Sequence, residues 1–307
     1  MGPPGACRGD ATPGDTRVTN PNHNPGPVTG PNHGPNPGPV TGPNSGPVAN
    51  PTAERVILRA PAKLTLRLRI TGVRPDGYHT IDADMVTLDW HDTLTITPRL
   101  GCDTPVLTAS GPFAIGVPLD ESNLVVKALR MVGRVADIHL DKQIPHGGGL
   151  GGGSADAAAV LRWAGHSDVV AAASLGADVS FCLVGGRARV RGIGEIVDSQ
   201  PIEPFDVTLV VPPLAVSTPA AYRAWDALGG PRADGPNDLE PAALRVEPQL
   251  ALWRDRIREV VGEPPTLAGS GATWFVRGHH PSLVEALPQA KVVQTRTDRP
   301  QQAADGR

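Results

Sequence analysis

The sequence predicts an α+β protein, and three stretches of the chain carry that prediction. Residues 60–70 alternate apolar and polar side chains, as a half-buried strand does. Residues 145–161 read PHGGGLGGGSADAAAVL and place two glycine triplets directly before a helix-forming run. Residues 206–211, DVTLVV, have the composition of a fully buried strand, and a helix signal follows them. This order of strands and helices favours two α+β layers with the glycine-rich stretch at their junction.

The two ends of the chain do not have the composition of folded protein. Residues 1–53 are rich in Asn, Pro and Gly, and the motif NPGPVTGPN occurs there twice. Such a segment buries too little apolar surface to offset chain entropy, so we expect a disordered tail over 1–53. Folded sequence is expected to begin near Glu54, and residues 299–307 are expected to fray.

Composition narrows the class of function. The chain has 307 residues, a net charge of −3 and a pI of about 6.3, which argues against a nucleic-acid binder. Its three cysteines, Cys7, Cys102 and Cys182, show no metal-binding spacing and are typical of a reduced cytoplasmic protein. With no signal peptide and no long apolar run, no membrane association is expected. A monomer and a homodimer are both compatible with the sequence.

The first folded elements are a strand, a turn and further strands. In the strand 60–70, Lys63 and Thr65 fall on the open face, where a solvated lysine is the simplest interpretation. The Pro-Asp-Gly turn that follows brings Tyr78 and His79 to the next strand, where packing and ligand contact are both open. The pattern then predicts strands at 85–89 and 93–97, a helix at 124–132 capped by Ser122 or Asn123, and a strand at 136–140.

The glycine-rich stretch predicts an anion site. Ser154 is a suitable N-cap, Asp156 would lie in the first helical turn, and closely spaced glycines let backbone N–H groups converge on a phosphate chain. No Gly-Lys-Ser/Thr closes the run, so it is not a Walker A loop, and no dinucleotide fingerprint fits well. A flexible linker is the alternative, although a linker needs neither a cap nor an apolar helix.

The next segment contains an isolated acidic residue. Ser167 is expected to cap a short helix that ends at residues 175–181, LGADVSF. Asp178 lies in that turn, where a helix cap and a functional carboxylate are both open. A turn and strand at 185–195 follow.

The last third of the chain reads as alternating helices and strands. Thr218 is expected to cap a helix to Leu228, with Pro219 at its first position and Tyr222 on the same face as Thr218. A helix around 248–261 places Trp253 in the core. A tight Gly-Ser-Gly turn at 269–271, a helix at 281–287 and a strand at 292–295 complete the fold.

Three separated segments resemble the motifs of the GHMP small-molecule kinases: APAKLTL around Lys63, the glycine stretch, and GSGAT at 269–273. Further motifs resemble the branch of that family that acts on a cytidyl substrate, namely DGYHT at 76–80, LGADVSF, GIGE at 192–195 and NDLEPAAL at 237–244. The similarity spans residues 56–297. One such motif is weak evidence, but this many in the right order is strong.

The resemblance implies a fold, a reaction and a nucleotide site. The fold would be the two-domain GHMP kinase fold, with a ribosomal-protein-like N-terminal domain at 54–200 and a ferredoxin-like C-terminal domain at 201–298. The reaction would be ATP-dependent phosphorylation of the 2-hydroxyl of a diphosphocytidyl sugar alcohol in the non-mevalonate isoprenoid pathway. ATP would bind Pro145, His146, Gly147, Gly148, Gly149, Leu150, Gly151, Gly152, Gly153, Ser154 and Ala155.

The resemblance also implies roles for isolated residues. Asp178 would accept the proton of the attacking hydroxyl, and Lys63 would keep that aspartate ionised and stabilise charge on the transferring phosphoryl group. Mg²⁺ would arrive with ATP, with the Ser154 hydroxyl near it. The cytosine would lie between two tyrosine rings with an imidazole at its edge. Its contacts would be Tyr78, His79, Thr218 and Tyr222.

The chain departs from the family pattern at three places. Thr65 replaces a usual asparagine, Ser180 replaces a common proline, and the connection before Asp178 is short. None of these removes a catalytic group. Two alternatives stay open: another GHMP kinase, for homoserine or mevalonate, and a non-catalytic nucleotide-binding relative, which the short connection leaves possible. The DGYH turn together with Tyr222 favours the cytidyl substrate, because a small substrate without a nucleotide would not require them.

Overall fold

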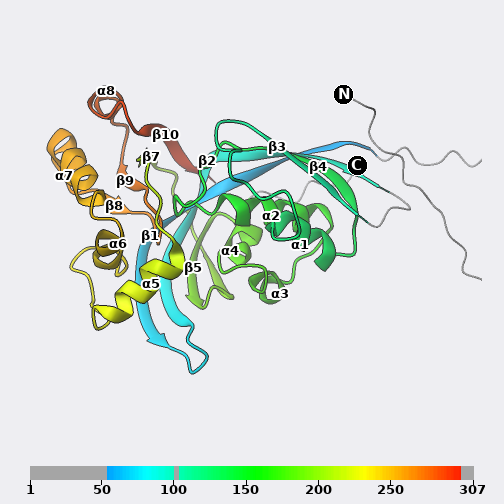
Figure 1. The fold of residues 1–307 in the computed structure, drawn as a ribbon, viewed down its shortest axis with the longest axis horizontal. Helices are drawn as coiled ribbons and strands as arrows, with labels where there is room; N and C mark the ends of the chain where they lie inside the picture. Colours follow the sequence, from blue (N-terminus) through cyan, green and yellow to red (C-terminus); the bar gives the residue numbers. More distant parts are fainter. Residues whose placement is uncertain (1–53, 100–103, 299–307) are drawn as a thin grey trace, which may run out of the picture. The chain divides into compact units, whose positions relative to one another are not determined.

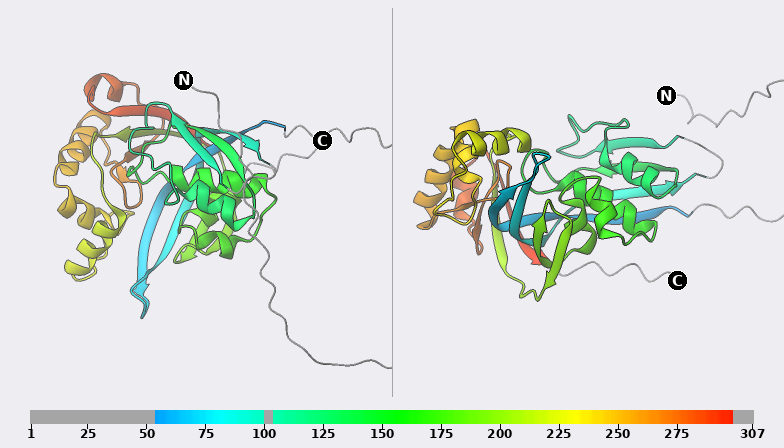
Figure 2. Two further views of the ribbon diagram at one scale, coloured as in Figure 1. Left: turned by 45° about the vertical axis from the view of Figure 1, so that its right-hand side comes forward. Right: turned by 90° about the horizontal axis from the view of Figure 1, so that it is seen from below.

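A long antiparallel hairpin organises the structure, a computed structural model that describes residues 54–99 and 104–298. Its strands are β1 (Val56–Val73) and β2 (His79–Pro98), and its tip extends beyond the neighbouring helices (Figures 1 and 2). The predicted tail over 1–53 and the predicted frayed end over 299–307 lie outside the described residues, as do Cys7 and Cys102.

One mixed sheet extends from this hairpin in both directions. Its main path runs β3-β4-β2-β10-β7-β9-β8, β1 and β5 also pair with β2, and β6 pairs with β5. Only β3 and β4 pair in parallel among the described strands. The strands are β3 (Val106–Ser110), β4 (Ala136–Asp141), β5 (Arg187–Gly192), β6 (Ile196–Gln200), β7 (Asp206–Val211), β8 (Thr266–Leu267), β9 (Trp274–Arg277) and β10 (Lys291–Asp298).

The helices form two groups along the chain and in space (Figure 1). The first group packs beside β1, β2 and β4 and comprises α1 (Leu124–Met131), α2 (Gly152–Trp163), α3 (Val169–Ala173) and α4 (Val179–Val184). The second group packs against β7, β8 and β9 and comprises α5 (Thr218–Ala227), α6 (Glu240–Val246), α7 (Leu250–Val261) and α8 (Ser282–Ala286). Within the described ranges, no helix is both long and apolar enough to cross a bilayer.

Three apolar clusters hold these layers together. One lies between the first helix group and its strands, and one lies between the second group and β7–β9. The third joins the two halves, because it contains side chains from β1, β2, β7 and β9 together with Ile144 and Leu150 from either side of the first glycine triplet. The glycine-rich stretch therefore lies over the junction between the layers, where the sequence predicts it.

The structure corrects the strand predictions in two respects. The separate strands predicted at 85–89 and 93–97 are one strand, β2, which stays paired with β1 past a register shift between Pro61 and Lys63. Lys63 and Thr65, predicted on an open face, are only 4% and 2% exposed. The reason is that the glycine-rich stretch and the Gly-Ser-Gly turn at 269–271 cover this face.

Several helix starts also differ from the predictions. Asp168, not Ser167, caps α3 by accepting a hydrogen bond from the Ala171 N–H. Ser217 occupies the N-cap of α5, so Thr218 is its first residue. The predicted helix at 248 begins at Leu250, and Trp253 packs against the second cluster while only partly buried. Such shifts by one or two residues are common where cap geometry depends on the preceding turn.

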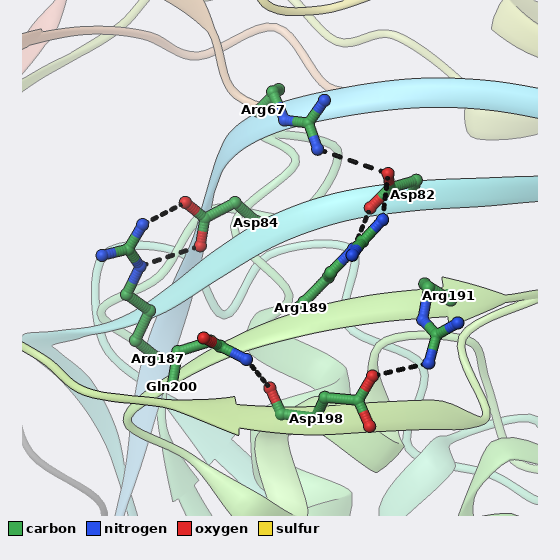
Figure 3. Close-up of polar contacts among 8 residues, drawn as sticks. All are labelled: Arg67, Asp82, Asp84, Arg187, Arg189, Arg191, Asp198 and Gln200. Carbon is green, nitrogen blue, oxygen red and sulfur yellow. Dashed lines mark hydrogen bonds and ion pairs between the residues drawn. The ribbon is translucent and has the colours of Figure 1, made fainter.

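Charged side chains form a ladder across β1, β2, β5 and β6 (Figure 3). Arg187 makes two hydrogen bonds to Asp84, and Arg189 makes two to Asp82, which Arg67 of β1 also contacts. The hydrogen bond from Arg189 lowers the pKa of Asp82 despite opposing desolvation. These half-exposed pairs specify which residues face one another across the strands and add little net stability, because water screens them.

Candidate active site

Two glycine-rich segments far apart in the sequence pack backbone against backbone. The N–H groups of Ala272 and Thr273 each lie 3.3 Å from the carbonyl oxygens of Gly147 and Gly148, respectively. Gly149 has φ +80°, and a Cβ atom there would lie 2.1 Å from the carbonyl oxygen of Ala268. Glycine is therefore required at this contact both by the backbone angle and by the space.

Lys63 lies buried between these two segments. Its backbone N–H donates to the carbonyl of Leu150 at 3.0 Å. A Cβ atom on Gly151 would come within 2.8 Å of its side chain, and one on Gly269 would lie 3.4 Å from its Nζ. The two glycine segments thus form the cover over the face of β1 that the sequence predicts to be open.

The amine of Lys63 has two oxygen neighbours. Its Nζ lies 3.3 Å from Oδ2 of Asp178 and donates a hydrogen bond to the Thr65 hydroxyl at 3.2 Å. The lysine side chain is 5% exposed, whereas that of Asp178 is 31% exposed. The aspartate therefore faces both the buried ammonium group and the solvent side, where a small molecule has access to it.

Asp178 occupies the N-cap position of α4 but does not cap it. Its side chain makes no cap hydrogen bond, so the capping interpretation does not account for its presence. The turn before it packs closely against the turn of the β5–β6 hairpin, because a Cβ on Gly194 would lie 2.3 Å from the carbonyl oxygen of Ala177. This close packing fixes the backbone that carries the carboxylate.

A cleft of about 300 Å³ opens between the glycine-rich stretch, Asp178 and the start of α5. Most residues predicted to bind ATP line it, and so do Thr218, Ser270 and Gly271. Two do not: Gly148 lines a neighbouring cavity, and Ala155 is only 1% exposed inside α2. The residues lining the cleft from the predicted set are Pro145, His146, Gly147, Gly149, Leu150, Gly151, Gly152, Gly153 and Ser154.

The helix that follows the glycines begins earlier than predicted. It starts at Gly152 with Gly151 at the N-cap, whose left-handed backbone (φ 68°) turns the chain directly into the helix. Ser154 is therefore inside the first turn and does not cap it. Its position on the cleft leaves the hydroxyl available to a ligand, beside N–H groups that no helix carbonyl satisfies.

The four predicted substrate residues are only partly brought together. The rings of His79 and Tyr222 lie 4.7 Å apart at a tilt of 34°, and Thr218 forms a 2.7 Å hydroxyl contact with Ser270. Burial, with the negative charge of Asp178 adding to it, raises the pKa of the Tyr222 phenol. Tyr78 is 62% exposed, and no ring contact joins it to Tyr222 among the described residues.

Sequence reasoning missed two neighbours of His79. Its Nε2 lies 2.7 Å from Oδ1 of Asp226, and its ring meets that of Trp225 edge-on at 5.5 Å. Both residues follow Tyr222 on α5. The sequence carries a helical-spacing signal for them, since Tyr222, Trp225 and Asp226 are three and four positions apart.

A buried charged triad beneath the glycine-rich stretch was also missed. Lys142 contacts both Asp92 and Asp156, the latter at 2.5 Å, and all three are at most 4% exposed. Asp92 also accepts the backbone N–H groups of Gln143 and Ile144. The triad therefore joins residues 142–144, which precede the glycine-rich stretch, to α2, which follows it. Asp156, predicted in the first turn, lies in the second turn and points inward.

Replacing Asp156 with asparagine should reduce the dependence of stability on pH. Burial, with Asp92 adding to it and Lys142 opposing it, raises the pKa of Asp156 to about 7. Because the folded-state pKa lies above the unfolded one, this group stabilises the fold at low pH and loses that contribution as pH rises through 7. The unfolding free energy should therefore fall between pH 6 and pH 8 as Asp156 loses its proton.

Urea unfolding of the wild type and Asp156→Asn at pH 6, 7 and 8 measures this effect. The unfolding free energy of the asparagine variant should fall less over this pH range than that of the wild type, because an amide does not titrate. Identical slopes for the two proteins would contradict the assignment of the titration to Asp156.

Comparison with known proteins identifies the family. The profile of the GHMP kinases N terminal domain matches residues 123–186. A curated relative from Paracoccus denitrificans, named 4-diphosphocytidyl-2-C-methyl-D-erythritol kinase, is 40% identical over 70% of this chain and 84% of its own length. A relative of the same name from Jannaschia sp. is also 40% identical, over 70% of this chain and 86% of its own length. The chain belongs to the 4-diphosphocytidyl-2-C-methyl-D-erythritol kinase family.

Solved structures agree with this membership. A crystal structure of 4-(cytidine 5'-diphospho)-2C-methyl-D-erythritol kinase matches with a TM-score of 0.61 and 29% identity, covering 79% of this chain and 99% of the other. A homoserine kinase from Cytophaga hutchinsonii, at 17% identity and a TM-score of 0.56, covers 81% of this chain and 96% of its own and shares the fold. The protein is an ATP-dependent small-molecule kinase with the α+β GHMP kinase fold.

The departures from the family pattern have visible structural consequences. Thr65, in place of the usual asparagine, supplies the hydroxyl that contacts Lys63. Ser180, in place of a common proline, donates to the Val169 carbonyl at 2.8 Å and so ties α4 to the short helix α3. Both polar groups are therefore satisfied by the kinase fold itself.

The NDLEPAAL motif of the kinase family has a structural role that the sequence analysis did not predict. The buried Asn237 side chain donates to the carbonyls of Leu267 and Gly269 at 2.9 and 2.7 Å. Asp238 accepts hydrogen bonds from Arg69 and from the Ile70 N–H. The motif thus joins the late glycine turn to β1, the strand that carries Lys63.

Proposed function

We propose that this protein transfers the γ-phosphoryl group of ATP to the 2-hydroxyl of 4-diphosphocytidyl-2-C-methyl-D-erythritol in the non-mevalonate isoprenoid pathway. The observation that carries the proposal is the Lys63–Asp178 contact of 3.3 Å at the edge of the glycine-lined cleft. A carboxylate and a buried ammonium group beside a phosphate-binding loop are what a phosphoryl transfer to an alcohol requires.

In this proposal the glycine-rich stretch holds the nucleotide phosphates. Most residues of this stretch, from Pro145 to Ser154, line the cleft, and the first turn of α2 directs unsatisfied N–H groups and the positive end of its dipole toward it. The absence of Cβ atoms lets the backbone approach the phosphate oxygens closely.

Asp178 and Lys63 have complementary roles in the proposed transfer. The Asp178 carboxylate accepts the proton that the 2-hydroxyl loses as its oxygen attacks the γ-phosphorus. The positive charge of Lys63 stabilises the negative charge of that carboxylate and of the transferring group. Thr65 supports this arrangement because its hydroxyl accepts a hydrogen bond from Lys63.

Mg²⁺ is proposed to enter with ATP. Within residues 54–99 and 104–298 no group of three or more His, Cys, Asp and Glu side chains is suited to a metal ion. The Ser154 hydroxyl, which lines the cleft, is an oxygen donor of the type Mg²⁺ accepts, and phosphate oxygens would supply most of the remaining ligands. When bound, the ion would neutralise phosphate charge.

The cytidyl part of the substrate is proposed to bind where the β1–β2 hairpin meets α5. Tyr222 and His79 already form one aromatic wall there, Thr218 supplies a hydroxyl, and the exposed ring of Tyr78 is free to close over a base. Stacking would supply affinity, and hydrogen bonds would supply base identity.

The remaining assignments are also proposals. We infer a ribosomal-protein-like domain at 54–200 and a ferredoxin-like domain at 201–298; this boundary falls between β6 and β7. We also infer a cytoplasmic location, no nucleic-acid partner, and a monomeric or homodimeric state.

Release of ADP with three acceptors in parallel tests the proposed function: the cytidyl substrate, homoserine and mevalonate. The expected result is turnover of the cytidyl compound alone. Turnover of homoserine or mevalonate would favour one of the other GHMP kinases. No turnover of any acceptor by a folded wild type would favour a non-catalytic relative.

A further inference from the structure

His79 is held in place by three side chains of α5. Asp226 Oδ1 lies 2.7 Å from its Nε2, while the rings of Tyr222 and Trp225 contact its face and edge at 4.7 and 5.5 Å. The His79 side chain is only 10% exposed. Trp225 is itself fixed, because its indole N–H donates to the Pro231 carbonyl at 2.9 Å. The imidazole therefore has a defined orientation before substrate binds.

The contact with Asp226 determines which ring nitrogen carries the proton. A carboxylate oxygen only accepts hydrogen bonds, so Nε2 must carry a hydrogen. In the neutral imidazole this leaves Nδ1 with its lone pair, as an acceptor. No hydrogen bond to Nδ1 is formed by the described residues, so this acceptor is available to a ligand.

The two common pyrimidine bases differ at the group that such an acceptor would read. Cytosine carries an amino group at position 4, which donates hydrogen bonds, whereas uracil carries an oxygen there, which accepts them. An imidazole with an Nδ1 lone pair pairs with the amino group and repels the oxygen. The opposite tautomer, with hydrogen on Nδ1, would favour uracil.

We propose that Asp226 is a positioning residue that sets substrate specificity: by holding His79 in the Nε2–H form, it makes Nδ1 an acceptor that selects a 4-amino pyrimidine. This inference rests on the proposed function, since it assigns the choice of base within the same substrate site. Asp226 itself does not touch the substrate; it acts through His79.

The first test compares the kcat/KM values of the cytidyl substrate and its uridyl counterpart. In Asp226→Asn, the amide presents either an N–H or a C=O to Nε2, so the tautomer is no longer fixed. The preference for the cytidyl compound should fall by about tenfold or more. The loss should appear in the KM of the cytidyl compound, with kcat and the KM of ATP changed less than about threefold.

Two further variants separate positioning from folding. Asp226→Glu keeps a carboxylate acceptor and should retain most of the discrimination. Arg223→Ala removes an exposed side chain of the same helix and should change neither substrate's kinetics. Equal discrimination by the wild type and Asp226→Asn, or equal loss in Asp226→Glu and Asp226→Asn, would overturn the proposal.

A spectroscopic measurement keeps the inference independent of turnover. Nitrogen NMR of the full-length protein reports which His79 nitrogen carries hydrogen, and the wild type should show hydrogen on Nε2 alone. In Asp226→Asn the Nδ1–H form should become populated. A wild type with hydrogen on Nδ1 alone would contradict the inference, whereas a wild type with the expected tautomer that turns over neither substrate would contradict only the proposed function.

Discussion

Replacing Asp178 with asparagine should lower kcat by about 10² to 10⁴-fold while leaving the fold intact, because general-base catalysis contributes on that scale. The amide has the same shape as the carboxylate but cannot accept the hydroxyl proton. The side chain caps nothing in α4, and the amide oxygen can still accept a hydrogen bond from Lys63, so the fold should remain intact. The KM of ATP should change much less than kcat.

Asp168→Asn is the matched control for this variant. Asp168 lies in the same segment but caps α3 through the Ala171 N–H, and asparagine is an equally good cap. Its kinetics should equal those of the wild type. Steady-state assays of the two variants, together with circular dichroism, separate the roles; an Asp178→Asn enzyme with unchanged kcat would remove Asp178 from the chemistry.

Replacing Gly149 with alanine should destabilise the fold by about 2 to 5 kcal/mol, the sum of a left-handed backbone cost and of overpacking. The added Cβ would meet the Ala268 carbonyl oxygen at 2.1 Å and the Gly271 N at 2.9 Å, both of them backbone atoms that cannot move aside as a side chain can. The two glycine segments would have to separate, which would also open the cover over Lys63.

Gly153→Ala is the matched control for this second prediction. Gly153 lies inside α2, where a Cβ has no neighbour closer than 4.0 Å. Alanine should stabilise the helix there by about 0.5 to 1 kcal/mol. Urea unfolding of both variants gives the comparison; equal stability of the two would contradict the contact between the glycine segments.

Local patterns in the sequence were sufficient to predict much of the fold. The alternation in β1, the alanine-rich run of α2 and the apolar run of β7 depend on neighbours along the chain, and each of these elements is present. The start of α2 was misplaced because a left-handed glycine at position 151 begins the helix without a side-chain cap. That backbone angle leaves no mark on the sequence beyond the glycine itself.

The parts of the site that depend on distant partners could not be predicted. Lys63 is buried because the Leu150 and Gly269 segments cover it, and neither pairing is encoded near Lys63. The partners of Lys142 and the contact between His79 and Asp226 join residues far apart in the chain. From the local sequence alone, polar residues in such contacts are predicted to lie on the surface, because their partners are distant in the chain.

Phosphorus NMR of the reaction mixture tests the central claim most directly, because it identifies the bond that forms. With ATP and the cytidyl substrate, the account predicts ADP and one new phosphomonoester signal on the methylerythritol 2-oxygen, with the cytidyl diphosphate signals retained. This signal should be nearly absent with Asp178→Asn. Release of inorganic phosphate without a new ester, or a phosphate ester at another hydroxyl, would contradict the account.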